Sequence, residues 1–518
     1  MALQRCSYRA EIDPPRSIVF ASAYCPELAH KNGLCVFHDP DPNKNATVLA
    51  DRLRERLEDR NENPIRLDGA IFPDGVSFEG MAFDRSVSFF KAEFHGQVTS
   101  FSKATFAGEE VFFEKARFLA NDTTFEGSKF SGRHVTFQDA IFRGETTTFG
   151  YANFSSEEVR FFEAEFHSHA TAFVATAFRC DRVVFSYAKF RGQYTTFHSA
   201  RFEAKLVYFA GVEFLGAEVW LTCLFESPRV TFWDAKFLAR RTRLAQPGQA
   251  GGLLFGGREP SGVFLKGFVE IETGPYSEAG SVVFDWVDLR RTRLLGADVS
   301  NMKFFDVTWA RPETPGQRWL PRRNWRLGVY DEVVWRRKRR TARPAAEFDA
   351  KYLSGLGRCY RILKDYYKST GEHHLVGNFH YGLMEIRWYQ RELDQLRKGS
   401  SWVRRKWKKW FSWEAAYRLC SGYGEDYAWA GGVLLALIFL FAIVYAILGL
   451  PLGVQAESRW ARGLHALLYS FQVATLGRVT FYEPAKDLVV HFLQLVESIV
   501  VPLQFGFFAF ALRNVFRR

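Results

Sequence analysis

Large apolar side chains recur along the first half of the chain with a period that fits neither a helix nor a strand. From Leu67 to Phe237, phenylalanines alternate at spacings of five and seven residues, whereas a helix repeats a face every 3.6 residues and a strand every two. A small residue stands between the phenylalanines of a unit, as in Phe101-Ser-Lys-Ala104-Thr-Phe106, and the unit recurs after 12 residues. This pattern indicates a chain that turns a corner every few residues, with one large and one small side chain inward on each face.

A second block shows the same arrangement in its simplest form. Large apolar residues stand at every fifth position, and they are Phe284, Leu289, Leu294, Val299, Phe304 and Trp309. Both blocks resemble the pentapeptide-repeat proteins, and this resemblance implies a right-handed quadrilateral β-helix. We therefore expect a multidomain chain with a β-solenoid over 67–239, an insertion over 240–281 and final coils over 282–310.

The last part of the chain, 427–518, holds two apolar stretches that are long enough to cross a bilayer. They cover 428–450 and 488–512, and about 20 apolar residues in a helix span the roughly 30 Å of hydrocarbon. A segment between them, 464–483, is amphipathic for most of its length and too short to cross. The order of these elements is a span, a half-helix, a small-residue turn and a second span. This order predicts a re-entrant pore helix between two transmembrane helices.

The turn after the short segment resembles the filter of two-transmembrane, pore-loop ion channels. Thr475-Leu476-Gly477 matches the start of the potassium filter T-V-G-Y-G, but Arg478 replaces its aromatic residue and a valine replaces its second glycine. Because carbonyls on the pore axis need glycine there, the resemblance implies the architecture without potassium selectivity. Arg478 would disfavour cations and Glu483 could cancel its charge, so the sign of the ion stays open. The resemblance also implies a homo-oligomer, with a tetramer as the expected ring.

The second span carries residues that suit a permeation pathway. Gln494 and Glu497 lie about one turn apart, and a carboxyl inside a bilayer usually faces a bundle interior or water. We predict that Glu497 lines or gates the pathway; the alternative is an interhelical hydrogen bond made by a protonated carboxyl. Pro502 and Gly506 would permit a kink as the pore opens. A plain two-helix anchor is the alternative for the whole region.

Basic and aromatic residues dominate the chain between the solenoid and the first span. We predict a basic linker over 311–346, a helical hairpin over 347–400 that breaks at Gly371, and an amphipathic interfacial helix over 401–420. The interfacial tryptophans of this last helix are Trp402, Trp407, Trp410 and Trp413. Gly422-Tyr423-Gly424 precedes the first span, so we interpret it as a turn at the membrane entry.

Four soft metal ligands stand near the start of the chain, in the segment 1–45. They are Cys6, Cys25, Cys35 and His38, and Cys35-x-x-His38 has the spacing of a tight zinc knuckle. Three thiolates and an imidazole suit tetrahedral zinc, which could supply folding energy that so short a segment lacks. We predict structural zinc, for which His30 could serve as a substitute ligand; the alternative is a group of ordinary buried or free cysteines, with Cys6 too remote to join. The segment 46–66 is predicted to be a charged linker with one short exposed helix over 50–63.

Charge indicates a membrane topology and disfavours some partners. The net charge is +12, and lysines and arginines crowd the segment before the first span and the end of the chain. This bias assigns both termini to the cytoplasm, and no apolar run of signal-peptide length occurs in the first 30 residues. We expect a multi-pass protein of the inner (plasma) membrane of a prokaryote. Acidic and basic residues nearly balance over 67–237, so a DNA mimic is disfavoured. The basic segment 317–346 could bind nucleic acid, hold the solenoid near anionic headgroups, or be a solvated linker; for the whole chain we expect nucleic acid to be an unlikely partner.

These patterns together favour an ion channel over an enzyme, since no nucleophile–base constellation or nucleotide loop is recognisable. We predict an oligomer in the lipid bilayer that passes ions and whose cytoplasmic solenoid is a sensor or an assembly scaffold. The sequence does not name the stimulus, which could be a cytoplasmic ligand or protein. The alternative is a non-conducting, membrane-tethered scaffold whose solenoid binds a protein partner.

Overall fold

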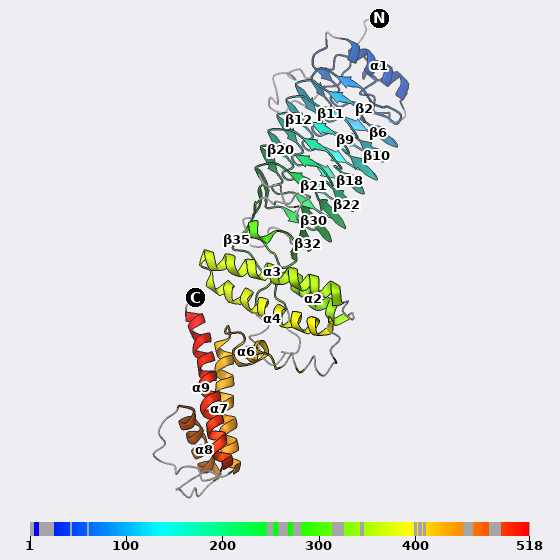
Figure 1. Ribbon diagram of the computed structural model, residues 1–518. Coiled ribbons are helices and arrows are strands. Elements are labelled where there is room, and N and C mark those ends of the chain that lie inside the picture. The colour runs from blue at the N-terminus through cyan, green and yellow to red at the C-terminus, as the bar shows by residue number, and fades with distance from the viewer. Residues whose placement is uncertain are drawn as a thin grey trace. The chain divides into compact units, whose positions relative to one another are not determined.

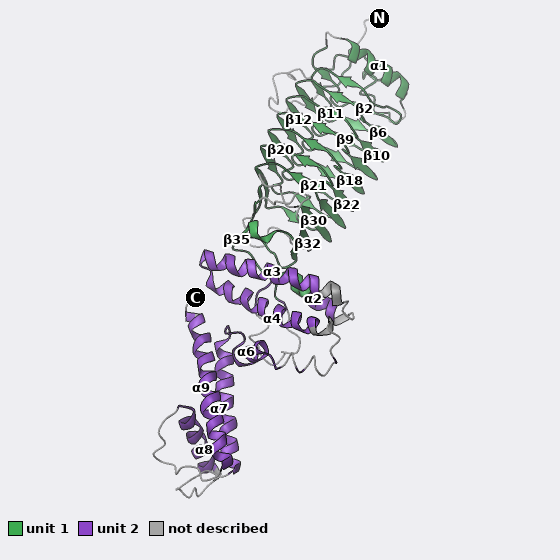
Figure 2. Cartoon of the chain, viewed as in Figure 1, with its two compact units in different colours: residues 1–311, 329–334 green, residues 312–328, 335–518 purple. Residues whose placement is uncertain are grey.

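The computed structural model describes residues 5–9, 25–41, 44–59, 62–245, 252–256, 268–272, 281–312, 326–341, 346–397, 401, 407, 411–448, 459–475 and 488–516. They fall into two compact units, 1–311 with 329–334 and 312–328 with 335–518 (Figure 1) (Figure 2). The first unit is a β-solenoid with a small N-terminal segment, and the second is helical. The predicted order, a solenoid followed by helices and two candidate membrane spans, is confirmed.

The solenoid consists of four parallel sheets, in which each strand pairs with the strand one coil further along. The first sheet contains β1 (Ile65–Arg66), β4 (Val87–Ser88), β8 (Glu110–Phe112), β12 (His134–Thr136), β16 (Glu158–Arg160), β20 (Arg182–Val184), β24 (Leu206–Tyr208), β28 (Arg229–Trp233), β31 (Gly252–Gly256), β33 (Ser281–Asp285) and β35 (Met302–Phe305). The second contains β6 (Val98–Ser100), β10 (Asp122–Thr124), β14 (Thr146–Thr148), β18 (Ala170–Ala172), β22 (Tyr194–Thr196), β26 (Glu218–Leu221), β30 (Arg241–Ala245), β32 (Phe268–Glu272) and β34 (Thr292–Gly296). The third contains β3 (Ala82–Phe83), β7 (Thr105–Phe106), β11 (Lys129–Phe130), β15 (Asn153–Phe154), β19 (Ala177–Phe178), β23 (Arg201–Phe202) and β27 (Leu224–Phe225). The fourth contains β2 (Ile71–Phe72), β5 (Glu93–Phe94), β9 (Arg117–Phe118), β13 (Ile141–Phe142), β17 (Glu165–Phe166), β21 (Lys189–Phe190), β25 (Glu213–Phe214) and β29 (Lys236–Phe237).

One coil takes two of the 12-residue units over most of the solenoid. Val135 pairs with Val111 before it and with Val159 after it, so each unit covers two of the four faces. The segment 240–281, which we expected to interrupt the coils, supplies β30, β31 and β32, which continue two of the sheets in register. They do so because alternate apolar residues, such as Leu253 and Phe255, extend the buried ladders.

Phenylalanine rings fill the interior as stacked ladders. Successive rings lie face to face, and the centroids of Phe125 and Phe149 are 4.7 Å apart at 1° from parallel. Rings of neighbouring ladders meet edge-on, as Phe137 and Phe149 do at 88°. Both are favourable aromatic geometries, so this core accounts for much of the excess of phenylalanine in the chain, which has 52 such residues.

Helix α1 (Ala46–Glu58) precedes the first coil. It begins four residues before the predicted segment 50–63, because the side chain of Asn45 caps its first turn. It is also less exposed than we predicted, since Leu49, Leu53 and Arg56 are buried. The helix therefore packs as part of the first unit.

A carboxylate closes the last edge of the second sheet. Asp331, in the first turn of α2 (Tyr330–Thr341), accepts the backbone N–H of Leu294 at 2.7 Å and lies 3.3 Å from Nε of Arg293. Such a contact protects an edge strand from pairing with another chain. We had predicted a linker over 311–346; α2 forms there because its acidic first turn favours the positive end of the helix dipole.

The second unit contains α3 (Ala346–Thr370), α4 (His373–Arg397), α6 (Trp413–Ser421), α7 (Tyr427–Leu448), α8 (Arg459–Ala474) and α9 (Leu488–Phe516). Helices α3 and α4 lie in the segment where we expected a hairpin, and Gly371 turns the chain between them with φ of +83°. Helix α6 begins at Trp413, where the Ser412 hydroxyl accepts the backbone N–H of Ala415 at 3.2 Å. Most of the predicted interfacial helix before it, 402–406 and 408–410, lies outside the described residues.

Helices α7 and α9 are long and apolar enough to cross a membrane. They run antiparallel, since Gln504 of α9 bonds to Ala430 near the start of α7 and Tyr445 near its end bonds to Glu497 (Figure 1). Only 11% of the most apolar window of α7 is buried. A core helix of a soluble protein would be mostly buried, so this exposure is typical of a helix that contacts lipid.

Candidate metal centre and membrane module

The four predicted metal ligands converge in the first unit. The Sγ atoms of Cys6, Cys25 and Cys35 and Nδ1 of His38 lie within 4.8 Å of one another, and all four residues are buried. The sulfurs of Cys25 and Cys35 are 3.8 Å apart, and Nδ1 lies 3.5 Å from Cys6 Sγ and 3.1 Å from Cys35 Sγ. Tetrahedral zinc has sulfur–sulfur and sulfur–nitrogen edges of about 3.8 and 3.5 Å, from its usual bond lengths. The cluster therefore has the size and the donor set of a metal site.

The first coil of the solenoid orients the histidine. Nε2 of His38 lies 2.7 Å from the backbone carbonyl oxygen of Asp68. A carbonyl can only accept, so Nε2 carries the proton and Nδ1 presents its lone pair to the sulfurs. The ring of Tyr8 stacks on the imidazole at 3.8 Å. Such outer partners hold a metal ligand in its binding orientation.

Of the three thiols in the cluster, Cys35 has the lowest pKa. A hydrogen bond from the Cys25 thiol, aided by the backbone N–H of His38, holds the pKa of Cys35 far below that of a free cysteine. The hydrogen bond with Cys35, together with burial, raises the pKa of Cys25, and burial raises that of Cys6. The backbone N–H of Cys35 also donates to Cys6 Sγ at 3.2 Å. A metal cation would displace the remaining thiol protons, because cysteine binds metal as thiolate.

Four protein ligands leave no open position, which is typical of a structural and not a catalytic metal site. Lys44 stabilises the loop that carries Cys35 and His38, since its Nζ donates to the carbonyls of Phe37 and Asp39 at 3.0 and 2.9 Å. Sequence reasoning found the four ligands and missed Tyr8, Lys44 and Asp68. No sequence signal marked these three, because their roles arise from contacts formed on folding.

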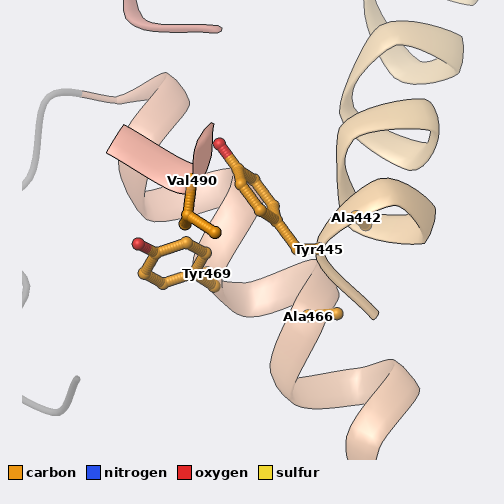
Figure 3. Packing of buried hydrophobic residues seen from close by; sticks show 5 residues of the cluster. All are labelled: Ala442, Tyr445, Ala466, Tyr469 and Val490. Atoms are coloured by element: carbon orange, nitrogen blue, oxygen red, sulfur yellow. The ribbon is translucent and has the colours of Figure 1, made fainter. Parts of the chain in front are cut away.

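Helix α8 packs against both candidate spans near the end of α7. Its 16 residues cover about 24 Å at 1.5 Å per residue, less than the roughly 30 Å of a bilayer core. Tyr469 of α8 meets Tyr445 of α7 edge-on, with centroids 5.0 Å apart. Figure 3 shows these rings beside Val490 of α9, in one cluster with Ala442 and Ala466.

Glu497 ties the three helices of this module together. Its side chain is fully buried; Tyr445 of α7 donates to Oε2 at 2.7 Å, and Ser470 of α8 contacts Oε1. The Ser470 hydroxyl also lies 3.0 Å from the carbonyl oxygen of Ile438. One hydroxyl proton cannot serve two acceptors, so a protonated Glu497 that donates to Ser470 satisfies all these groups at once. An interhelical hydrogen bond of a protonated carboxyl is the alternative that we named, and the lining or gating role stays a prediction for the assembled chain.

The other predicted gate residues of α9 differ in their surroundings. Gln494 donates from Nε2 to the hydroxyl of Tyr469, so it also joins α9 to α8. Pro502 lies inside α9, which continues through it as one helix. A Cβ at Gly506 would meet no heavy atom within 4 Å, so this position lies on an open face of the unit.

The predicted filter turn begins where α8 ends. Thr475 is exposed, and its hydroxyl donates to the carbonyl of Phe471 at 2.9 Å. The rest of the predicted filter lies outside the residues that the structure describes, and comprises Leu476, Gly477, Arg478 and Glu483.

Two of the four predicted interfacial tryptophans can be placed. Trp407 and Trp413 are exposed, at 64% and 85% of their surface. Amphipathic aromatic rings with this exposure suit a membrane–water interface. Trp402 and Trp410 lie outside the described ranges.

A buried carboxylate that sequence reasoning missed joins the hairpin to the turn before the first candidate span. Glu385 of α4 is fully buried, 3.0 Å from Nε of Arg418 in α6, and accepts the hydroxyl of Tyr423 at 3.3 Å. Burial, and then the charge of Glu385, raises the pKa of Tyr423, so the phenol keeps its proton. Tyr423 lies in the turn that we predicted, where Gly422, Tyr423 and Gly424 all have positive φ. Nothing in the sequence distinguishes Glu385 from the other charged residues of its helix.

Comparison of the chain with protein-family models, with curated proteins and with solved structures yields no match. Its function is therefore inferred from the residues themselves.

Proposed function

We propose that the chain forms a homo-oligomeric ion channel of the inner membrane, with a tetramer as the expected ring. In this proposal a cytoplasmic pentapeptide-repeat solenoid is joined to a two-span pore module. The observation that carries it is α8, a helix too short to cross that is held against both candidate spans. A plain anchor needs only the two spans, whereas a pore needs a half-helix to place a filter at membrane depth.

The outer face of α8 supports an assembly of several copies. Leu464, Leu468 and Phe471 are exposed on this helix, and two spans from one chain cannot enclose a pathway. A second copy of the chain is the occupant that we propose for this face, because a closed ring would cover it on every subunit.

The ion that passes is set by opposing charges at the filter turn. The C-terminal carbonyls of α8 end at Ala474 and present the negative end of the helix dipole, which attracts cations. Arg478 follows in the sequence and acts in the opposite sense. Reversal potentials in unequal salt solutions would decide the sign of the permeating ion.

Ion flux from liposomes that contain the purified full chain tests the proposal. We expect Gly477→Val to change or abolish the flux, since it adds a branched side chain to the predicted filter. Glu497→Gln, measured in parallel, separates the two roles considered for that carboxyl: a changed flux supports a lining or gating role, and an unchanged flux supports an interhelical hydrogen bond, because an amide donates and accepts as a protonated carboxyl does. A silent oligomer would favour the alternative, a membrane-tethered scaffold that binds a protein partner. A silent monomer would contradict the channel.

We also propose that Cys6, Cys25, Cys35 and His38 hold structural zinc. The support is the tetrahedral size of the cluster, its three sulfurs and one nitrogen, and the Asp68 carbonyl behind His38. Such a site would fasten the N-terminal segment to the first coil of the solenoid. The expected role is folding stability and not catalysis.

A further inference from the structure

A cavity of about 640 Å³ opens in the second unit beside the membrane entry. Four elements build it: α3, α4, the turn before α7, and the last turns of α9. Its lining residues are Lys364, Lys368, His373, Val376, Gly377, His380, Glu425 and Asn514. This volume lies within the usual range for small-molecule sites, about 300–1,000 Å³.

Cationic and imidazole side chains dominate the polar lining of this cavity. Lys364 and Lys368 lie one turn apart on α3, His373 and His380 lie two turns apart on α4, and Glu425 is the one carboxylate of the lining. Burial, then the charges of Lys364 and Arg387, lowers the pKa of His380 to about 4. The site therefore has a positive local field and a neutral imidazole that can donate a hydrogen bond.

The cavity lies where the two candidate spans leave the membrane. Glu425 stands two residues before α7, and Asn514 lies in the last turn of α9. Nδ2 of Asn514 donates to the backbone carbonyl of Gly424 at 3.0 Å, which joins the two sides of the entry. In the proposed topology this is the cytoplasmic headgroup level, where lysines attract anionic phosphates.

We propose that this cavity binds a phosphate-bearing anion, with Lys364 and Lys368 as its cationic contacts. The phosphate could belong to a lipid headgroup of the inner leaflet or to a soluble molecule, and both share this chemistry. A bound anion would link the hairpin to both spans. The inference rests on the proposed membrane topology and not on conduction, so it can fail or hold independently of the channel.

Binding to the full chain in nanodiscs tests the proposal. One arm compares neutral phosphatidylcholine discs with discs that also contain phosphatidylglycerol; the other adds inorganic phosphate or pyrophosphate to neutral discs. We expect one arm to raise the Tm of the wild type. For the double variant Lys364→Gln/Lys368→Gln, the same rise in Tm should need at least a tenfold higher concentration of the anion. A response to the lipid alone assigns a headgroup, and one to the soluble probe alone assigns a free phosphate.

A matched pair of variants excludes a general charge effect. Lys351→Gln/Arg358→Gln removes two exposed cations from α3 outside the cavity lining, and it should keep the wild-type response. Glu425→Gln should strengthen binding, because it removes a carboxylate from the cavity. The proposal is overturned if neither arm changes the Tm, or if the two double variants lose the response equally.

Discussion

The hydroxyl of Tyr445 donates a hydrogen bond to the Glu497 carboxyl over 2.7 Å, and both side chains are fully buried. This contact joins α7 to α9 at the level where α8 packs against both. Since Ser470 of α8 meets the other carboxyl oxygen, one side chain holds three helices. The carboxyl therefore sets the position of α8 relative to the two candidate spans.

Glu497→Leu should loosen this three-helix module, whereas Glu497→Gln should not. Leucine leaves the hydroxyls of Tyr445 and Ser470 without their carboxyl partner, at a cost of about 1–3 kcal/mol for each group. The measurement is thermal unfolding in detergent. Tyr445→Phe should lower the Tm less than Glu497→Leu, because it removes one hydrogen bond only. Equal Tm values for the leucine and glutamine variants would contradict the role of Glu497 in holding the three helices together.

Chelation should release one zinc ion per chain and destabilise the first unit. Metal that binds only the folded chain adds about 4 kcal/mol at a concentration a thousand times its dissociation constant. Elemental analysis gives the metal content, and circular dichroism of the β-sheet signal gives the transition. Cys35→Ser should abolish the metal content, and Cys180→Ser, which changes a buried cysteine outside the cluster, should retain it. Metal bound equally to both variants would contradict the site.

Two residues of one coil should differ sharply in their tolerance to truncation. Phe149 is fully buried in the ring ladder, whereas Tyr151, two residues further on, is 66% exposed. We expect Phe149→Ala to lower the free energy of unfolding by about 3–5 kcal/mol, because it leaves a cavity. Tyr151→Ala should change it by about 0.5 kcal/mol or less. Denaturant titration of the β-sheet signal compares the two, and similar losses would contradict the ladder as the source of stability.

Acidification should weaken the α3–α4 hairpin through His380. Its pKa is lowered from 6.5 to about 4 in the folded chain, so the unfolded state binds the proton first as the pH falls. The contribution of the neutral His380 side chain to the free energy of unfolding is fully present above pH 6.5. It is lost as the pH falls toward 4, and the loss is at most about 3 kcal/mol. The Tm of the wild type should fall in this window more than that of His380→Gln. Parallel Tm profiles of the two proteins would exclude His380 as the cause.

Local patterns in the sequence determined the elements of this protein. Phenylalanine spacings of five and seven identify a cornered coil because each turn buries its own residues, and the apolar length of 428–450 identifies a candidate span. Cys35-x-x-His38 brings two of the four residues together within one tight turn, so the candidate metal centre was also visible in the sequence.

Only the tertiary structure decided which residues meet. It showed that two 12-residue units form each coil, that 240–281 continues the sheets, and that Asp331 closes an edge. The contacts of Glu497 could not be read from the sequence, because its partners, Tyr445 and Ser470, lie 52 and 27 residues away. Glu385 was missed for the same reason, since Tyr423 lies 38 residues away. A polar side chain on a helix has the same local pattern whether it faces water or a buried partner, and only the packing of distant segments distinguishes the two.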